Sequence, residues 1–351
     1  MSAKRIPVGI LGATGMVGQH FVKFLQNHPW FDIAWLGASD RSSGKPYREA
    51  TSWRLEGAMP ASVRDVIVQD CVPSASAPRL MFSATDASVA TEIERAFAQA
   101  GHVVVSNSRN HRMEPDVPLL IPEVNPDHLK MIPHQQRVRG WKGQITTNPN
   151  CSTIVIVLAL APLKKFGIKR VVSTTMQAIS GAGYPGVASL DVNANVIPYI
   201  GGEEDKMENE TQKLLGEIVG DKFQPLAATV SAHCNRVPVL DGHTATISVE
   251  FERKPSREEI LRAFAEYRSV PQERKLPSAP AQPVIYMEEN DRPQPRRDVE
   301  RERGMAVFVG RLRECPVFHY KFIALGHNTI RGAAGAAVLN AELMQTEGLL
   351  D

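Results

Sequence analysis

The sequence predicts an α/β protein with two domains, a parallel sheet in its N-terminal part and a mixed or antiparallel sheet in an α+β part that follows. Strand-like and helix-like segments alternate over the first third of the chain, as a parallel sheet with crossover helices requires. Later segments alternate apolar and polar residues with a period of two, which is typical of a sheet with one covered face. The length of 351 residues is sufficient for two cores.

The elements of the first domain follow from apolar runs and their spacing. We expect strands at Ile6–Leu11, Asp32–Gly37, Leu80–Ser83 and His102–Ser106, and helices at Met16–Gln26 and Ser88–Ala100. A loop rich in proline and polar residues is expected from Asn107 to about Gly143. A short strand at Gln144–Thr147 then leads through a turn into a long apolar helix, Ser152–Phe166.

The second domain is predicted from period-two segments, which are Arg170–Ser180, Gln224–Ser231, His243–Glu252, Pro283–Tyr286 and Met305–Glu314. A helix is expected at Ser256–Tyr267, because Ser256 and Glu259 form a capping-box pattern. The segment Pro271–Gly304, rich in proline and charge, is expected to run over the surface, and Ile330–Glu347 is expected to be a helix.

Composition excludes several classes of protein. With 43% hydrophobic and 22% charged residues the chain is typical of globular proteins, and a net charge of +2 without basic–aromatic clusters makes nucleic acid an unexpected partner. Glycines interrupt the N-terminal apolar stretch, which argues against the core of a signal peptide. The longest other apolar run, Ile154–Ala161, is too short to span a membrane. Four widely spaced cysteines without a CxxC pair indicate a reducing compartment, hence the cytoplasm, and no metal site.

A glycine-rich turn stands between the first predicted strand and the first predicted helix. Glycine there permits a tight turn and lets backbone N–H groups approach a pyrophosphate at the positive N-terminus of the helix. The apolar strand before it and the apolar helix after it make the motif more specific than a bare glycine triplet. The alternative is a turn without a ligand. We predict a dinucleotide site of Rossmann type, with contacts from Gly12, Thr14, Gly15, Met16, Val17 and Gly18.

The residues after the second predicted strand indicate which dinucleotide is bound. Asp40 would grip a ribose 2′-hydroxyl and favour NAD. The hydroxyls of Ser39 and Ser42 with the cation of Arg41 make a better site for a 2′-phosphate, and Lys45 adds a second positive charge. We therefore predict NADP/NADPH as the cofactor, with NAD as the alternative.

Cys151 begins the long apolar helix, directly after Asn-Pro-Asn. Unpaired N–H groups and the helix dipole favour thiolate over thiol at such a position, and the same N–H groups can stabilise an oxyanion. The alternative is a small buried hydrophobic residue. The other cysteines have no such setting and are expected to be structural; they are Cys71, Cys234 and Cys315.

A thiol nucleophile needs a base, and His243 is the candidate among ten histidines. It opens a strand after a tight Asp-Gly turn, with Arg236 on the strand before it. If the two strands pair, a cation that can hold a carboxylate bidentately lies near the base. The alternative is a structural or surface histidine.

Five motifs occur in order along the chain: Gly12–Gly18, Asn148–Thr153, Gln177–Gly183, Glu203–Lys206 and Arg236–His243. Together they resemble the aspartate-semialdehyde dehydrogenase family, most closely its archaeal and fungal branch, over nearly the whole chain. The resemblance implies a phosphorylating aldehyde oxidoreductase of the aspartate pathway to lysine, methionine and threonine. It would convert L-aspartyl 4-phosphate and NADPH to L-aspartate 4-semialdehyde, NADP and phosphate.

The resemblance also implies residue roles at the reacting centre. Cys151 would form a thioester, His243 would be its acid/base partner, and Gln177 would orient the intermediate. Arg236 would hold the substrate α-carboxylate and Glu203 would face its ammonium. The phosphate would be held by Lys206, Arg112 and Asn150. Arg109 is a weaker candidate than Arg112 for the arginine of this set. Without the resemblance, Glu203 and Lys206 would be read as a surface ion pair and Gln177 as an ordinary polar strand residue.

Further cofactor contacts are implied at Ser83, Thr85, Ser180, Gly181 and Gly183. The motif Gly326–Gly332 resembles the family's cofactor-contacting loop, in which Asn328 would bond the nicotinamide carboxamide. The NADP-binding domain would then be discontinuous, comprising residues 1–149 and 329–351, with a catalytic and oligomerisation domain at 150–328.

Two other functions remain open from the sequence. A sister enzyme, N-acetyl-γ-glutamyl-phosphate reductase or a malonyl-CoA reductase, would share the fold and the cysteine, but an acid at Glu203 suits a free ammonium better than an acetylated nitrogen. A non-catalytic NADP sensor would leave the cysteine, histidine and glutamine without purpose. The expected partners are a small-molecule substrate and further copies of the chain, as a homodimer or homotetramer.

Overall fold

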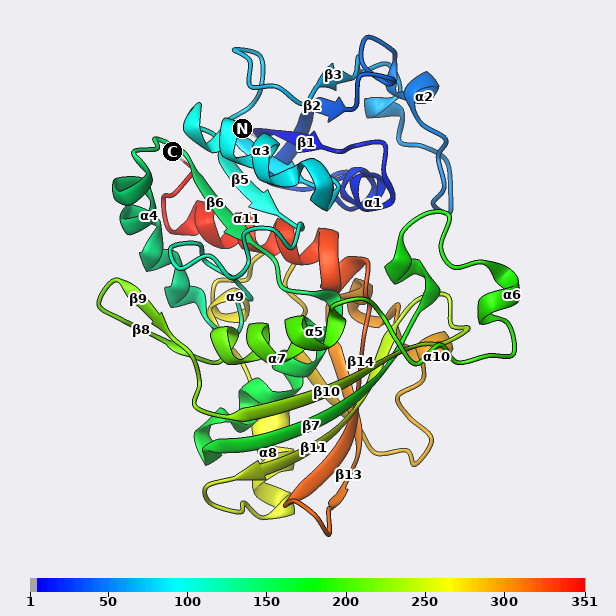
Figure 1. Ribbon diagram of the computed structural model, residues 1–351, viewed down its shortest axis with the longest axis vertical. Helices are drawn as coiled ribbons and strands as arrows, with labels where there is room; N and C mark the ends of the chain where they lie inside the picture. Colours follow the sequence, from blue (N-terminus) through cyan, green and yellow to red (C-terminus); the bar gives the residue numbers. More distant parts are fainter. Residues whose placement is uncertain (1–4, 351) are drawn as a thin grey trace. The chain divides into compact units, whose positions relative to one another are not determined.

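The computed structural model describes residues 5–350 (Figure 1). They form two compact units. The first unit contains the chain up to Leu120, the segment Asp127–Asn148 and the stretch from Ala333 onward. The second unit contains Ile121–Pro126 and Pro149–Gly332. The chain therefore passes more than once between the two units.

The first unit is built on a six-stranded sheet with the order β3-β2-β1-β4-β5-β6, in which every pair is parallel. Its strands are β1 (Ile6–Leu11), β2 (Phe31–Ala38), β3 (Gln69–Asp70), β4 (Leu80–Ser83), β5 (Val103–Ser106) and β6 (Gln144–Thr147). This is the doubly wound dinucleotide-binding order, and its switch point lies between β1 and β4. The predicted parallel α/β sheet is confirmed.

The helices of the first unit are α1 (Met16–Phe24), α2 (Tyr47–Ala50), η1 (Ala61–Val63), α3 (Ala87–Gln99), α4 (Ile132–Arg139) and α11 (Gly335–Thr346), and η2 (Pro126–Met131) begins at the edge of the unit. The expected loop from Asn107 to Gly143 is wrong in its second half, because η2 and α4 lie there. Helix α4 lacks an apolar stripe. Its buried Gln135 instead donates to the carbonyls of Asp116 and Ile145.

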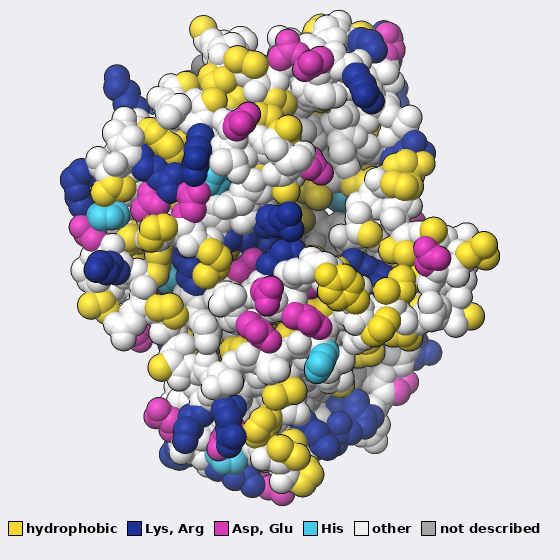
Figure 2. Space-filling view, viewed as in Figure 1, with side chains coloured by type: hydrophobic (Ala, Val, Ile, Leu, Met, Phe, Trp, Pro, Cys, Tyr) yellow, Lys and Arg dark blue, Asp and Glu magenta, His cyan; other side chains and the backbone are white. Residues whose placement is uncertain are grey.

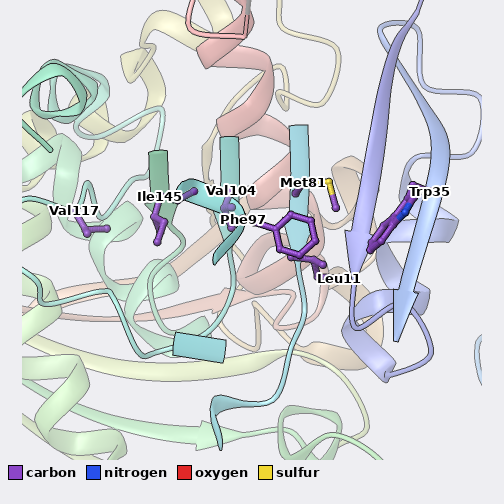
Figure 3. Close-up of a cluster of buried hydrophobic side chains, with 8 residues drawn as sticks. Leu11, Trp35, Met81, Phe97, Val104, Val117 and Ile145 are labelled. Carbon is purple, nitrogen blue, oxygen red and sulfur yellow. The ribbon is translucent and has the colours of Figure 1, made fainter. Parts of the chain in front are cut away.

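The core of the first unit fixes the strand ends that carry the glycine turn. Side chains from β1, β2, β4, α3, β5 and β6 meet in one cluster, to which Leu11, Trp35, Met81, Phe97, Val104, Val117 and Ile145 belong (Figure 3). Every one of these residues is at most 3% exposed. Close packing of this kind resists displacement of the strands, so the turn after β1 starts from a fixed point.

The second unit is built on a mixed sheet with the order β10-β7-β11-β14-β13-β12. Its strands are β7 (Ile168–Gln177), β10 (Thr229–Arg236), β11 (His243–Phe251), β12 (Val284–Met287), β13 (Val307–Glu314) and β14 (Tyr320–Gly326). The outer pairs β10–β7 and β12–β13 are parallel and the inner pairs are antiparallel. The predicted mixed sheet is confirmed.

One strand prediction needs correction, and one strand was missed. The segment Gln224–Ser231 is not one strand, because β9 (Lys222–Gln224) ends before Pro225 and β10 begins at Thr229. Proline lacks the N–H that a continuing ladder needs. Strand β9 pairs with β8 (Glu217–Val219) in a separate hairpin. The strand β14 was not predicted.

The helices of the second unit are α5 (Cys151–Leu160), η3 (Ala161–Phe166), η4 (Ile179–Ala182), α6 (Ser189–Val192), α7 (Glu203–Leu214), α8 (Arg257–Glu266), α9 (Val270–Glu273), α10 (Pro295–Asp298) and η5 (Arg301–Gly304), and η6 (Ile330–Ala334) begins at its edge. Helix α5 packs against β11, β13 and β14, and α7 packs against β10. The capping box at the start of α8 is confirmed. Within residues 5–350, no helix is both long and apolar enough to cross a membrane.

The segment Pro271–Gly304 is not a plain surface excursion, as the sequence led us to expect. Its strand β12 joins the central sheet in parallel with β13. Asp298, which is fully buried, accepts from the backbone N–H of Gln294 at 2.7 Å and from Nε of Arg292 at 2.7 Å. Pairing and a buried carboxylate therefore fix the segment, although its composition is that of a loop.

Candidate active site

Cys151 is the first residue of α5, and its Sγ lies 3.2 Å from Nε2 of His243. Asn150 caps the helix, because its Oδ1 accepts from the N–H groups of Ser152 at 2.9 Å and Thr153 at 3.2 Å. The sequence predicted that the first N–H groups of this helix would serve an oxyanion. Two of them are occupied by the cap instead, so the sulfur has the positive helix end beside it but fewer N–H groups than expected.

Both ring nitrogens of His243 have a partner: Nε2 faces Cys151 and Nδ1 faces Ala178. Its Nδ1 accepts from the backbone N–H of Ala178 at 3.0 Å. A ring nitrogen that accepts carries no proton, so the neutral imidazole has its proton on Nε2, the nitrogen that faces the sulfur. Burial, and then the nearby charges of Arg236 and His327, lower the pKa of His243 to about 3. The ring therefore meets Sγ as an uncharged hydrogen-bond donor.

Arg236, the last residue of β10, lies close to His243, but not for the reason the sequence suggested. The strands β10 and β11 do not pair, because β7 lies between them. A Cβ built on Gly181 would lie 3.0 Å from both Nη1 of Arg236 and Cε1 of His243. Nη1 also donates to the carbonyl of Ala178 at 2.7 Å. Glycine at 181 therefore leaves open the space beside both the cation and the imidazole.

Glu203 is the centre of a second cluster in the same unit, and it is only 8% exposed. Its Oε2 accepts from Nδ2 of Asn150 at 2.7 Å and lies 3.5 Å from Nε2 of Gln177, while Oε1 accepts from Nζ of Lys206 at 2.8 Å. The reading of Glu203 and Lys206 as a surface ion pair does not describe this site. The carboxylate joins the start of α5, the end of β7 and the start of α7.

The other predicted substrate and cofactor residues lie in several places. Arg112 belongs to the first unit, where it is buried and its Nη2 donates to the carbonyl of Asn107 at 2.8 Å; Arg109 is exposed. In the second unit, Asn328 donates from Nδ2 to Oγ of Ser180 at 2.7 Å. Gly183, three residues after Ser180, has φ +70. Asn328 therefore contacts a neighbouring loop, a role that the sequence did not indicate.

The glycine turn of the first unit has the geometry that a dinucleotide requires. Gly12 has φ +74, and a Cβ there would lie 2.5 Å from the carbonyl oxygen of Ala84. A Cβ on Gly18 would lie 2.3 Å from the carbonyl oxygen of Gly12. A Cβ on Gly15 would meet nothing nearer than 3.5 Å. The first glycine thus makes the turn, the third lets helix and strand pack, and the second leaves backbone open to a pyrophosphate.

Three residues that the sequence analysis missed hold this turn in place. The carbonyl of Thr14 accepts from Nε2 of Gln19 at 3.0 Å and from Oγ1 of Thr51 at 3.1 Å. The hydroxyl of Tyr47 donates to the carbonyl of Ala13 at 2.8 Å. Tyr47 and Thr51 are more than thirty residues away in the chain, so no local pattern could have indicated them.

The residues after β2 are arranged around a tight turn in which the N–H of Ser42 donates to the carbonyl of Ser39 at 2.8 Å. Ser39 and Arg41 are exposed. Nζ of Lys45 donates to the carbonyl of Arg41 at 2.8 Å. Lys45 therefore stabilises the turn, whereas the side chains of Ser39 and Arg41 face solvent at the carboxyl end of β2.

Ser83, at the end of β4, is turned inward rather than toward the strand edge. Its Oγ donates to Oε1 of the fully buried Glu94 at 2.6 Å and lies 2.9 Å from Oγ1 of Thr85. Burial raises the pKa of Glu94. The single hydroxyl proton of Ser83 is used on Glu94, which leaves the partly exposed Thr85 as the side chain at this edge.

The remaining thiols differ from one another. Burial raises the pKa of Cys71, and it raises the pKa of Cys234 to about 11. Burial alone would also raise the pKa of Cys315, but the backbone N–H groups of Phe318 and Val317 outweigh it and the pKa is lowered. That these three cysteines are structural stays a prediction. Among residues 5–350, no group of three or more His, Cys, Asp or Glu side chains could hold a metal ion.

Comparison with known proteins identifies the family. The semialdehyde dehydrogenase profiles match two parts of the chain, the NAD binding domain at residues 7–132 and the dimerisation domain at residues 160–331. The aspartate-semialdehyde dehydrogenase of Methanothermobacter thermautotrophicus is 50% identical over 97% of this chain and 99% of its own length. The chain belongs to the aspartate-semialdehyde dehydrogenase family. The resemblance drawn from the five motifs is confirmed.

Fungal members of the family are similar as well. The aspartate-semialdehyde dehydrogenase of Cryptococcus neoformans is 48% identical over 99% of this chain and 98% of its own length. A crystal structure of the Candida albicans aspartate-semialdehyde dehydrogenase with NADP superposes with a TM-score of 0.91, at 42% identity over 99% of this chain and 100% of that one. The chain is thus an oxidoreductase of this family, and both its archaeal and its fungal likeness are confirmed.

Proposed function

We propose that this chain catalyses the NADPH-dependent reductive dephosphorylation of L-aspartyl 4-phosphate to L-aspartate 4-semialdehyde through a thioester on Cys151. The observation that carries the proposal is the pair formed by Sγ of Cys151 and Nε2 of His243, 3.2 Å apart in a chain of this family. A sulfur at a helix N-terminus that faces a ring N–H is suited to nucleophilic attack, because both favour the thiolate.

In this mechanism the Cys151 thiolate attacks the acyl carbon, the C–O bond to phosphate breaks, and the departing phosphate takes a proton from solvent. NADPH, when bound, supplies the hydride that reduces the thioester carbonyl. The oxyanion then collapses, the C–S bond breaks, and the aldehyde and the thiolate are released. His243 keeps its Nε2 proton throughout and donates from it to the sulfur or to the oxyanion. His243, for which the resemblance implied an acid/base role, would then act only as a hydrogen-bond donor.

The buried cluster around Glu203 supports the assignment of the substrate's two ends. Arg236 presents a guanidinium fork suited to the α-carboxylate, and Glu203 presents a buried carboxylate suited to the ammonium. Lys206 and Asn150, both bonded to Glu203, are proposed as phosphate ligands, with Arg112 as the third. Gln177, beside Glu203, would orient the thioester.

The first unit is proposed as the NADP-binding domain. The open backbone at Gly15 supports a pyrophosphate contact, and the turn with the exposed Ser39 and Arg41 and the partly exposed Ser42 supports a 2′-phosphate contact. Contacts from Thr85, Ser180, Gly181, Gly183 and Asn328 to the cofactor belong to the same proposal. The functional division would then follow residues 1–149 with 329–351 for the cofactor, and residues 150–328 for catalysis and oligomerisation.

We propose a homodimer or homotetramer in the cytoplasm. The dimerisation-domain match covers residues 160–331. Within it, large apolar side chains gather around α6, as Figure 2 shows; Tyr184, Val196 and Tyr199 are exposed and Leu190 is 93% exposed. An apolar surface of this kind is typical of a contact with another protein chain.

A substrate comparison tests the proposed function. The reaction is run in the oxidative direction with NADP and phosphate, on aspartate semialdehyde and on N-acetylglutamate semialdehyde. We expect the parent to use the first and largely ignore the second, because an acetylated nitrogen has no charge for Glu203 and more bulk. Preference for the acetylated aldehyde would favour the sister enzyme, while the thioester chemistry would stand.

Two variants sharpen this test. Arg236→Lys should lower kcat/KM for aspartate semialdehyde by about 10- to 100-fold, because lysine cannot reproduce a bidentate pair. Glu203→Gln should lower it as well, because the charge that pairs with the ammonium is removed. Lys169→Arg, an exposed basic change in the same unit, serves as the control. Unchanged turnover in Glu203→Gln would refute the ammonium assignment.

Cofactor choice is tested separately at the turn after β2. Replacing Arg41 and Ser42 with apolar residues should weaken NADPH binding by about 10- to 100-fold and NADH binding little, because only NADPH carries the 2′-phosphate. Fluorescence titration with both nucleotides measures this directly. Equal losses would make Asp40 the ribose ligand and NAD the better candidate.

A further inference from the structure

Two short segments hold the imidazole of His243. One is the turn that enters β11, where Gly242 immediately precedes His243 and has φ +98. The other is the segment after β7, where the N–H of Ala178 donates to Nδ1 of His243 at 3.0 Å. The first sets where the backbone of His243 lies, and the second sets how its ring is turned. A change in the spacing of these segments would move Nε2 relative to Sγ.

Asn328 connects these two segments with a single side-chain amide. Its Oδ1 accepts from the N–H of Gly242 at 2.8 Å. Its Nδ2 donates to Oγ of Ser180 at 2.7 Å, two residues after Ala178. Asn328 is 2% exposed. Both bonds are short. One ends on Gly242, next to His243, and the other ends on Ser180, two positions after Ala178.

The segment that carries Asn328 is itself anchored. Arg331 and Glu123, both fully buried, form a bidentate pair with N–O distances of 2.9 and 2.5 Å. Removal of one partner from such a pair leaves a buried charge uncompensated, so the segment is strongly held. Next to Arg331, a Cβ on Gly332 would lie 2.6 Å from Cβ of Cys151. One segment therefore contacts both the cysteine and the structures that hold the histidine.

We propose that Asn328 is a positioning residue of the Cys151–His243 pair: its amide fixes the spacing between the Gly242 turn and the Ser180 loop, and thereby keeps the Nε2 proton directed at Sγ. The inference rests on the proposed function, in which Cys151 and His243 are the catalytic pair. It assigns to Asn328 a role that does not depend on bound nucleotide. A second N–H of its amide remains for the cofactor carboxamide, so the two roles are compatible.

Alkylation of Cys151 by iodoacetamide, without nucleotide or substrate, tests the proposal. The rate is followed against pH by mass spectrometry of the Cys151 peptide, in the full chain carrying Cys315→Ser. Asn328→Ala should slow alkylation at neutral pH about 5- to 10-fold and displace the pH profile upward, because the thiolate loses an aligned donor. Ser180→Ala, which removes one of the two bonds, should give a smaller change in the same direction. Asn195→Ala, an exposed asparagine with only local bonds, is the matched control.

A double variant separates positioning from other effects. In the His243→Asn background, Asn328→Ala should have no further effect on alkylation, because the donor it positions is already gone. Additive losses would overturn the proposal. So would an unchanged profile in Asn328→Ala together with weakened NADPH binding, which would make Asn328 a cofactor contact alone. If Asn328→Ala does not fold, Ser180→Ala decides on the same criteria.

Failure of the proposed function gives a different result. If Cys151 were not the nucleophile for an acyl phosphate, the reductase assay would fail while the coupling between Asn328 and His243 in alkylation would persist. Nitrogen-15 spectra of labelled histidine add a direct reading, since Nδ1 of His243 should be the unprotonated nitrogen in the parent. A mixture of tautomers is expected in Asn328→Ala, and a parent protonated on Nδ1 would refute the inferred geometry.

Discussion

Cys151→Ala should lose turnover by roughly 10⁴-fold or more, as expected when a covalent route is removed, while the fold and NADPH binding are kept. The side chain is small and partly exposed at the first position of α5, and the cap from Asn150 does not use the sulfur. Alanine therefore removes the nucleophile without disturbing the helix. Steady-state reduction of aspartyl phosphate measures the loss.

The matched control is Cys315→Ser, because backbone N–H groups lower the pKa of the Cys315 thiol. We expect nearly full turnover from this variant, although iodoacetamide will label Cys315 in the parent as well as Cys151. Cys234, whose thiol has a pKa of about 11, should be labelled last. If Cys151→Ala kept even a tenth of the parent activity, the thioester mechanism would be wrong.

His243→Asn should lower the rate by roughly 10²–10³, the range usual for removal of one hydrogen-bond donor that stabilises charge in the transition state. Asparagine is of similar size and can still accept from the N–H of Ala178, so the loss reports the missing Nε2 donor. Circular dichroism and nucleotide titration should match the parent. Normal turnover per folded molecule, with lower stability, would mean that His243 is structural.

The pH profile gives an independent test of the donor role. The pKa of His243 is lowered to about 3 by burial and by the charges of Arg236 and His327, whereas an ordinary histidine titrates near 6.5. The ring is therefore already uncharged at pH 5 and stays so up to pH 9. We expect no inflection of kcat/KM from this ring in that range. An inflection near pH 6.5 that disappears in His243→Asn would contradict the assignment.

The reason for the missed elements lies in their packing. Helix α7 carries a buried face that includes Glu203, Glu210 and Lys213, so it shows no apolar stripe. Helix α4 is likewise held by hydrogen bonds from Gln135. Period-based reading detects only faces that bury carbon. Period-based reading does not detect elements that bury paired polar groups.

The sequence by itself determined what depends on neighbouring residues. The strand–glycine–helix turn at Gly12–Gly18, the cysteine at the start of an apolar helix and the capping box at Ser256 are all local patterns, and each was found where predicted. A turn requires glycine where φ is positive, and a helix start requires a cap, whatever the rest of the fold does. These patterns were sufficient to indicate the α/β class, the cofactor domain and the candidate nucleophile.

The tertiary structure alone decided how the residues at the candidate site are arranged. It placed β7 between β10 and β11, so that Arg236 and His243 meet around Gly181 and not by strand pairing. It put the proton of His243 on Nε2 through the N–H of Ala178, 65 positions away in the chain. The physical reason is that a hydrogen bond between distant residues depends on which strands pair and in what register, and a local sequence pattern contains no record of either.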